Sequence, residues 1–275
     1  MKTKHALFGQ ILGLLLLAAG TTTTTSHAAL VLDFDSANYN PTTGIWADAS
    51  GNADNAFAPD PSNKPTLTSN ATPSGQPALT FTQAQLQYLD LTTHLNGAAF
   101  TSSPSFTLLA VARKVDASNG QLLSGDSNAP FQGLGYRIDG SAGNRQTLTK
   151  NNVIDVGQSA SATASGAFHL FAVTYDGTTA RFFRVGVADG TAVNSQTFNT
   201  GVLQIGVQAG TGAAGFVGDI AAIDVYDTVL SGAALSNAQN SLMGTYTAPE
   251  PGTAALLGMA LVGIAAVRRR RATAV

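Results

Sequence analysis

Residues 168–177 read FHLFAVTYDG, a run rich in aromatic and β-branched residues that ends in the turn signal Asp176-Gly177. This composition favours a β-strand, because such side chains pack well on a pleated surface. An Asp-Gly pair supplies the left-handed backbone positions of a tight turn. A second strand pattern follows at residues 179–187. The stretch therefore predicts two strands joined by a turn, the unit of an antiparallel sheet.

The same pattern recurs along the central part of the chain. Five further segments are predicted to be strands: 30–34, 86–91, 106–113, 203–207 and 216–226. Further turn signals lie at Asn96-Gly97, Asn119-Gly120, Asp139-Gly140 and Asp189-Gly190. The succession of strands and tight turns indicates an antiparallel all-β fold.

One helix is predicted, at residues 232–242. Ser231 can act as its N-cap, and Leu235, Ala238 and Leu242 fall on one face. Such a short helix covers part of a sheet rather than forming a second domain. The Pro-rich patch at 59–77 lies between segments of one domain pattern, so we expect a single domain over residues 30–247.

The charge of this central part excludes one class of partner. Residues 29–248 hold eight Lys and Arg against fifteen Asp, a net charge of −7. An acidic surface with scattered cations repels phosphate backbones, so no nucleic-acid partner is expected. The only glutamate of the chain is Glu250, and the chain has no cysteine, which excludes disulfides and thiolate chemistry.

The two ends of the chain have the composition of targeting segments. Lys2 and Lys4 precede an apolar run at 11–19, and Ser26-His27-Ala28 offers a cleavage site after Ala28, so residues 1–28 are predicted to be a signal peptide. At the other end, residues 253–267 form an uncharged apolar run. As a transmembrane helix this run would rise about 22 Å, less than the roughly 30 Å core of a bilayer. Flanking arginines and local thinning of the bilayer can close that gap.

In the segment 248–272, Pro249-Glu250-Pro251 precedes the apolar run, and Arg268-Arg269-Arg270-Arg271 follows it. This tripeptide, short helix and arginine cluster resemble the PEP-CTERM sorting signal of Gram-negative bacteria. The resemblance implies that an exosortase, a membrane protease, recognises Pro249, Glu250 and Pro251 and removes the tail. It implies a stop-transfer role for four residues: Arg268, Arg269, Arg270 and Arg271. The alternative is an ordinary tail anchor; a GPI signal would not normally end in four arginines. Because cationic segments stay cytoplasmic, the domain is expected outside the inner membrane.

Six blocks of the domain follow one another at 44–52, 75–81, 88–89, 106–113, 168–177 and 218–231, the first containing Trp46-x-Asp48-x-Ser50-Gly51-Asn52. In content and order these blocks resemble the LamG-like, concanavalin A-like jelly-roll domains of bacterial surface proteins. Two positions depart from the family: Ala222 stands where a Glu is frequent, and Val185-Gly186 replaces the Asn-Gly of a hairpin. The resemblance implies a jelly-roll β-sandwich, and the second departure puts a specific ligand loop in doubt.

Catalysis is not expected in this domain. Glycoside hydrolases on related jelly rolls use paired Glu residues, and residues 30–247 contain none. Two Asp pairs, Asp33 with Asp35 and Asp224 with Asp227, could substitute in principle, although Asp33 and Asp35 lie on one face of an edge-like segment without a motif. The only histidines of the domain, His94 and His169, have no metal-ligand spacing.

Two further motif matches lack the context that their chemistry requires. The glycines at 210–215 fit a dinucleotide-binding pattern but precede a strand instead of a helix. Gly125-Asp126-Ser127 is similar to the serine block of an esterase family, but no Asp-x-x-His follows near the end of the domain.

Two binding features remain open. Asp and Asn oxygens in loops suit calcium, and some LamG-like modules bind it, so a structural calcium is one expectation, without named ligands. Trp46 could stack on a sugar ring, but in this block we expect it to be a core anchor.

These observations predict an exported, non-enzymatic protein of the cell surface or extracellular matrix. Its jelly-roll module is expected to bind glycan or other components of an exopolysaccharide matrix. The alternatives are a structural coat protein without a specific ligand and, less favoured, a polysaccharide-degrading enzyme. Before processing, the tail would anchor the protein in the inner membrane.

Overall fold

The computed structural model describes residues 28–82, 86–91, 105–125, 133–150, 154–198, 203–209 and 212–247. The sorting tripeptide, the apolar run at 253–267, the arginine cluster and all but the last residue of the signal peptide lie outside these ranges. Within them, no helix is both long enough and apolar enough to cross a membrane.

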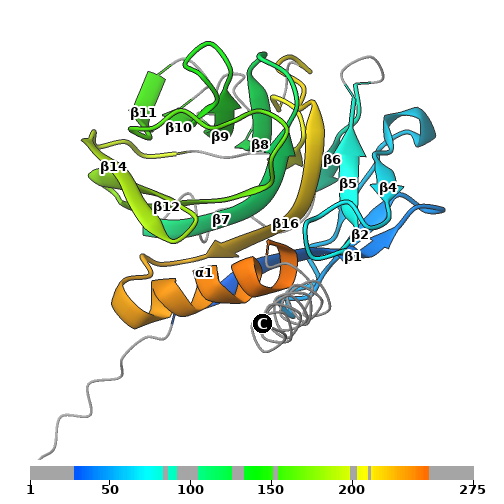
Figure 1. Ribbon diagram of the computed structural model, residues 1–275, viewed down its shortest axis with the longest axis horizontal. Coiled ribbons are helices and arrows are strands. Elements are labelled where there is room, and N and C mark those ends of the chain that lie inside the picture. The colour runs from blue at the N-terminus through cyan, green and yellow to red at the C-terminus, as the bar shows by residue number, and fades with distance from the viewer. Residues whose placement is uncertain are drawn as a thin grey trace, which may run out of the picture.

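The described part is an antiparallel β-sandwich that resembles an incomplete barrel (Figure 1). One layer contains nine strands: β2 (Ile45–Asp48), β3 (Ala56–Phe57), β6 (Leu89–Leu91), β15 (Leu203–Ile205), β8 (Gly120–Gly125), β9 (Leu134–Asp139), β10 (Arg145–Lys150), β11 (Ile154–Gln158) and the second half of β1 (Leu30–Asn40). The other layer contains the first half of β1 with β16 (Gly218–Tyr226), β7 (Ser105–Lys114), β12 (His169–Asp176), β13 (Thr179–Arg184) and β14 (Val187–Val193). A side branch adds β5 (Ala78–Phe81), which pairs with β16, and β4 (Thr66–Thr68). This is the all-β antiparallel architecture that the strand and turn pattern predicted.

Strand β1 links the two layers. Its first residues pair with β16, from Leu30 opposite Tyr226 to Asp35 opposite Ala222, and its last residues pair with β2. The two ends of the strand path also meet, because the Asn194 side chain, just after β14, donates a hydrogen bond of 3.1 Å to the Asp155 carbonyl in β11. This side-chain bond connects the two end strands, which share no backbone ladder in the part that the structure describes.

The long central strands are apolar on both faces because each face is covered. In β7, Phe106, Leu108 and Ala110 belong to the core between the layers, whereas Leu109 and Val111 point to the outer side. Helix α1 (Gly232–Tyr246) packs on that outer side across β7 and β12 and forms a second, smaller core (Figure 1). The unbroken apolar runs of these strands follow from burial on both faces.

The predicted helix is present and is longer than expected. Leu235 and Leu242 are buried and Ala238 packs beside them, as the one-faced pattern indicated. The helix continues to Tyr246, whose side chain is buried one turn beyond Leu242. Ser231 has the extended backbone of an N-cap, but its hydroxyl makes no capping hydrogen bond.

Two predictions around the hairpin after β12 are wrong. Residues 179–187 do not form one strand, because Val185 and Gly186 adopt φ angles of +50° and +78° and form the turn between β13 and β14. Asp189-Gly190 is not a turn but lies within β14. The pairing of β13 with β14 shifts there, and Gly190 takes a φ of +120°, so this left-handed position makes a bulge instead of a hairpin.

Candidate functional site

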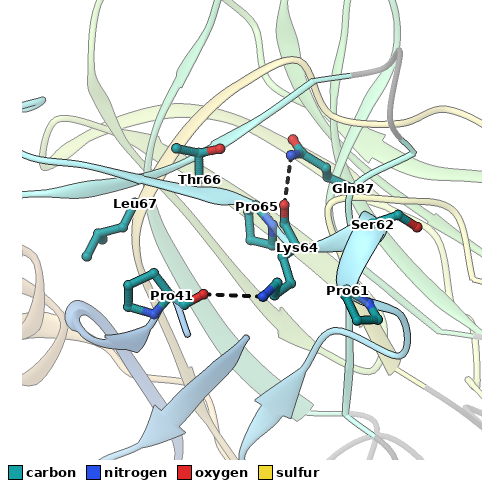
Figure 2. A pocket seen from close by; sticks show the side chains of 8 residues that line it. All are labelled: Pro41, Pro61, Ser62, Lys64, Pro65, Thr66, Leu67 and Gln87. Atoms are coloured by element: carbon teal, nitrogen blue, oxygen red, sulfur yellow. Dashed lines mark hydrogen bonds between the residues drawn. The ribbon is translucent and has the colours of Figure 1, made fainter. Parts of the chain in front are cut away.

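An open groove of about 580 Å³ lies on the N-terminal part of the sandwich (Figure 2). Its walls come from the end of β1, from the short 3-10 helix η1 (Pro61–Asn63) and from β4. Eight residues line it: Pro41, Pro61, Ser62, Lys64, Pro65, Thr66, Leu67 and Gln87. We call this the proline groove, because three of these eight residues are prolines.

Among the eight described residues that line the proline groove, Lys64 alone is charged. Its ammonium donates hydrogen bonds to the carbonyl oxygens of Thr42, at 3.2 Å, and Pro41, at 3.5 Å. A lysine has three N–H donors, so one remains without an acceptor among the residues that the structure describes. The carbon stem of Lys64 crosses Gly44, whose φ is +74°; a Cβ there would lie 2.7 Å from the Lys64 Cδ. Glycine at 44 therefore lets the stem lie flat.

The floor of the groove is held by two buried hydrogen-bonding side chains. The Gln87 Nε2 donates to the Lys64 carbonyl at 2.7 Å, and its Oε1 accepts from the Thr82 amide at 2.7 Å. The Tyr39 hydroxyl donates to the Pro65 carbonyl at 3.0 Å. At the rim, the Asp60 carboxylate caps η1 by accepting from the Ser62 amide and hydroxyl. The backbone around Lys64 is thus fixed from below while its side chain faces the groove (Figure 2).

A second cavity, of about 240 Å³, lies between β1, β16 and helix α1. Asp33 and Asp35 of β1 and Asp224 of β16 line it, together with Tyr226 and with Tyr246 of α1. We call this the acidic cavity. Burial, followed by the charges of Asp33 and Asp35, raises the pKa of Asp224 to about 7. Burial, followed by Asp48 and Asp35, also raises the pKa of Asp33.

In the structure, the aspartates of the two predicted pairs have different neighbours from those expected. Asp33 and Asp35 do share one face, but β1 is not an edge strand, because it is paired with both β16 and β2. Asp224 lies opposite Asp33 and not beside Asp227, which accepts a hydrogen bond of 2.9 Å from the Ala29 amide. Alternation within one strand predicted the shared face, whereas the partner across the sheet depends on a register that the sequence does not show.

Trp46 is a core residue, as expected. It is fully buried, its ring lies 5.1 Å from that of Phe34, and its Nε1 donates to the Asp35 carbonyl at 2.6 Å. Two residues later, the Asp48 carboxylate accepts from the amides of Asp33 and Ser50. The tryptophan block therefore joins β2 and its turn to β1, and Trp46 offers no ring to a ligand.

The other predicted positions are separate from both cavities or outside the described ranges. Ala28 precedes β1, and His169 begins β12, where burial and then the charge of Arg184 lower its pKa. Outside the described ranges lie His94, Asp126-Ser127, Gly210, and the sorting and stop-transfer residues Pro249, Glu250, Pro251, Arg268, Arg269, Arg270 and Arg271.

The described residues do not form a recognisable metal-binding site. In the part that the structure describes, no group of three or more histidine or acidic side chains is arranged to hold a metal ion. The structural calcium stays a prediction.

The comparisons with known proteins place the fold in a family. The family model of the concanavalin A-like lectin/glucanases superfamily matches residues 84–236, more than half of the chain, so the chain belongs to this superfamily. A second model, the PEP-CTERM protein-sorting motif, matches residues 247–271. The chain is therefore a secreted surface protein of the exosortase-processed type. No curated protein is significantly similar in sequence.

Solved structures with similar folds are distant in sequence. Domain 4 of an extracellular arabinanase from Geobacillus stearothermophilus is 16% identical, with a TM-score of 0.54, over 76% of this chain and 98% of that one. The binding domain of Paraclostridial Mosquitocidal Protein 1 is 12% identical, with a TM-score of 0.57, over 78% of this chain and 52% of that one. These likenesses confirm the fold class alone.

The proline groove lies almost entirely before the matched region. Seven of its eight lining residues precede residue 84, and only Gln87 falls within 84–236. These residues were not predicted to form a site, although the Pro-rich patch at 59–77 contains six of them, from Pro61 to Leu67. That patch was the available signal.

Proposed function

We propose that this protein is a non-enzymatic glycan-binding module of the cell surface or matrix and that the proline groove holds its ligand. The observation that carries the proposal is the open groove around Lys64 in a concanavalin A-like fold. Sugar rings present apolar C–H faces and hydroxyl groups together. Proline rings can pack against the former, and the remaining Lys64 N–H and the exposed Thr66 can bond the latter.

The chemistry of the groove favours binding over catalysis. Its lining contains one ammonium, two hydroxyls and one amide, but no carboxylate. A glycosidase of the usual kind needs two carboxyl groups across the scissile bond. The arabinanase domain with the similar fold was solved in complex with arabinotriose, so an architecture of this type can hold a short glycan.

Binding is tested with the full chain in detergent against the host's exopolysaccharide and a glycan array. The variant Lys64→Met keeps the carbon stem and removes the charge and the donors. We expect it to weaken glycan binding by about tenfold, the value of one charge-assisted hydrogen bond. Lys150→Met, on β10, removes one cation elsewhere and should bind like the wild type.

Two kinds of result would contradict this proposal, either the location of the ligand in the proline groove or the assignment as a glycan-binding protein. Unchanged affinity of Lys64→Met would place the ligand elsewhere. Absence of any glycan bound by the wild type, with abundant surface display, would favour the structural coat protein, and shortening of the polysaccharide would favour an enzyme.

We further infer that the tail first anchors the chain in the inner membrane and is then removed by the exosortase. The match to the sorting motif supports this route. An epitope placed before Pro249 should move from the membrane fraction to the surface fraction in the wild-type host and remain in the membrane when the exosortase gene is deleted. Identical fractionation in both strains would indicate that the tail is an ordinary membrane anchor that the exosortase does not remove.

A further inference from the structure

The acidic cavity gathers three carboxylates on one side of the sandwich. Asp33 and Asp224 are direct partners in the antiparallel pairing of β1 with β16, and Asp35 is two residues further along the same face. Helix α1 covers them with Ser241, Leu242, Thr245 and Tyr246. The cavity therefore lies between the sheet and the last helix before the sorting segment.

No positive charge balances this group. Among the described residues that line the cavity, none is a lysine, an arginine or a histidine. The titratable groups that face it are Asp33 and Asp35 from β1, Asp224 and Tyr226 from β16, and Tyr246 from α1, with Asp48 of β2 acting on Asp33. The last turn of α1 contains no basic residue either. Every charge that the cavity can acquire within this set is negative.

The helix side of the cavity is also incompletely bonded. The Tyr246 hydroxyl is buried, and no hydrogen bond of ordinary geometry reaches it, although Asp35 and Ser36 are its polar neighbours. Asp224 is only 8% exposed. Two ionised carboxylates opposite each other in a sheet repel, and burial increases the cost because water is excluded.

We propose that the acidic cavity is a pH-sensitive contact between helix α1 and the sheet. While its carboxyl groups are protonated, the helix stays docked; when they ionise, the helix is released. The raised pKa values of Asp224 and Asp33 mean that the docked state prefers the protonated form. The stability that this preference contributes is full below the ordinary pKa of an Asp, 3.8, and is lost as the pH rises toward about 7. Since α1 ends at Tyr246, its release frees the residues directly before the sorting motif.

Hydrogen exchange of the full chain in detergent tests this proposal. Protection factors, corrected for intrinsic exchange, are compared at pH 5.5 and 7.5 for α1 and for β7, which serves as the internal reference. For one carboxyl with a folded pKa near 7, linkage predicts that opening of α1 increases by about 20-fold between these pH values. Global unfolding also exposes Asp224, so β7 should lose protection too, but it should remain more strongly protected than α1 at both pH values.

The variant Asp224→Asn removes the titrating group at almost constant shape and should abolish the change in α1. Asp155→Asn is the matched control, because Asp155 lies on β11 and is 60% exposed. This substitution removes the same charge at a site away from the helix, so the pH-dependent change in α1 protection should persist. If Asp224→Asn does not fold, Asp33→Asn replaces it and should reduce the change, because Asp33 contributes to the raised pKa of Asp224.

Three results would overturn the proposal. They are equal α1 protection at both pH values in the wild type, an undiminished change in the Asp224 or Asp33 variant, or equal protection factors of α1 and β7 at pH 7.5. The last result would mean that α1 opens only when the whole sandwich unfolds. None of these results affects glycan binding at the proline groove, so the two proposals stand or fall separately.

Discussion

Asp33 on β1 lies directly opposite Asp224 on β16, so that the first and last strands of the sandwich place two carboxylates side by side beneath a helix. Like charges opposite each other weaken a sheet when both are ionised. The pairing survives because burial raises the pKa of Asp224 to about 7, with the charges of Asp33 and Asp35 adding to the effect.

The free energy of unfolding should therefore depend on pH. The folded-state pKa of Asp224 is above its ordinary value, so its contribution is present at low pH and is lost as the pH rises from about 4 to about 7. We expect a loss of about 2 kcal/mol between pH 5.5 and 7.5. Urea unfolding followed by the fluorescence of the single tryptophan measures it. Asp224→Asn should be more stable than the wild type at pH 7.5, and equal stabilities there would contradict this explanation.

The turn between β13 and β14 is expected to be strained. Val185 is β-branched, has a φ of +50° and is 43% exposed. Replacement by Asn, which tolerates this conformation, should stabilise the protein by about 1 kcal/mol. Val187→Asn is the matched control, since Val187 lies in β14 and is 68% exposed without a positive φ. Thermal unfolding should show a gain only for the variant at 185.

Trp46→Phe should destabilise the core without altering the ligand site. The change removes the hydrogen bond to the Asp35 carbonyl and leaves a space beside Phe34. We expect a loss of about 2–3 kcal/mol in urea unfolding followed by circular dichroism. Glycan affinity should be unchanged below the unfolding transition; a selective loss of binding by a folded variant would show that the ring contacts sugar.

Gly44→Ala should displace the Lys64 side chain in the proline groove, in addition to straining the backbone at residue 44. Gly44 and Gly51 both have positive φ, but a Cβ at 44 would meet the Lys64 side chain, whereas a Cβ at 51 has no neighbour within 4 Å. Both variants should lose about 1 kcal/mol from the left-handed backbone. Only Gly44→Ala should also weaken glycan binding, measured by calorimetry. Equal glycan affinities of the two variants would show that the position of the Lys64 side chain does not contribute to glycan binding.

Signal-peptide cleavage should add an ion pair. The Ala29 nitrogen lies 2.9 Å from the Asp227 Oδ1, and cleavage after Ala28 would convert it from an amide to an ammonium group. A chain that begins at Ala29 should be about 0.5 kcal/mol more stable than one that retains residues 26–28, because exposed pairs contribute little. Asp227→Asn should remove most of this difference, and 1 M salt should reduce it.

The sequence was most informative where strands are apolar on both faces. The runs in β7, β12 and β16 were predictable because both faces of these strands are largely buried, so most of their side chains are apolar. β10 was not predicted, since its residues are mainly polar, yet Gln146, Thr147 and Thr149 are buried. The Gln146 Oε1 accepts from the Tyr136 hydroxyl and its Nε2 donates to the Phe183 carbonyl, and such long-range bonds leave no local pattern.

Both cavities were missed for a related physical reason. The acidic cavity depends on the register of β1 with β16, whose residues Asp33 and Asp224 are remote in sequence. The proline groove depends on Lys64 reaching the carbonyl of Pro41 and on Gln87 binding the carbonyl of Lys64. Prolines marked the segment as irregular, but only tertiary structure shows that it is concave.

The pairing of the first strand with the last has a consequence for the timing of folding. Leu30 meets Tyr226 only after nearly the entire domain has been synthesised, and such distant contacts form slowly. A polypeptide that is threaded through a narrow pore must remain extended during transit. Because β1 has no partner β16 until then, the contact that joins the first strand to the last can form only late in the synthesis and export of the chain.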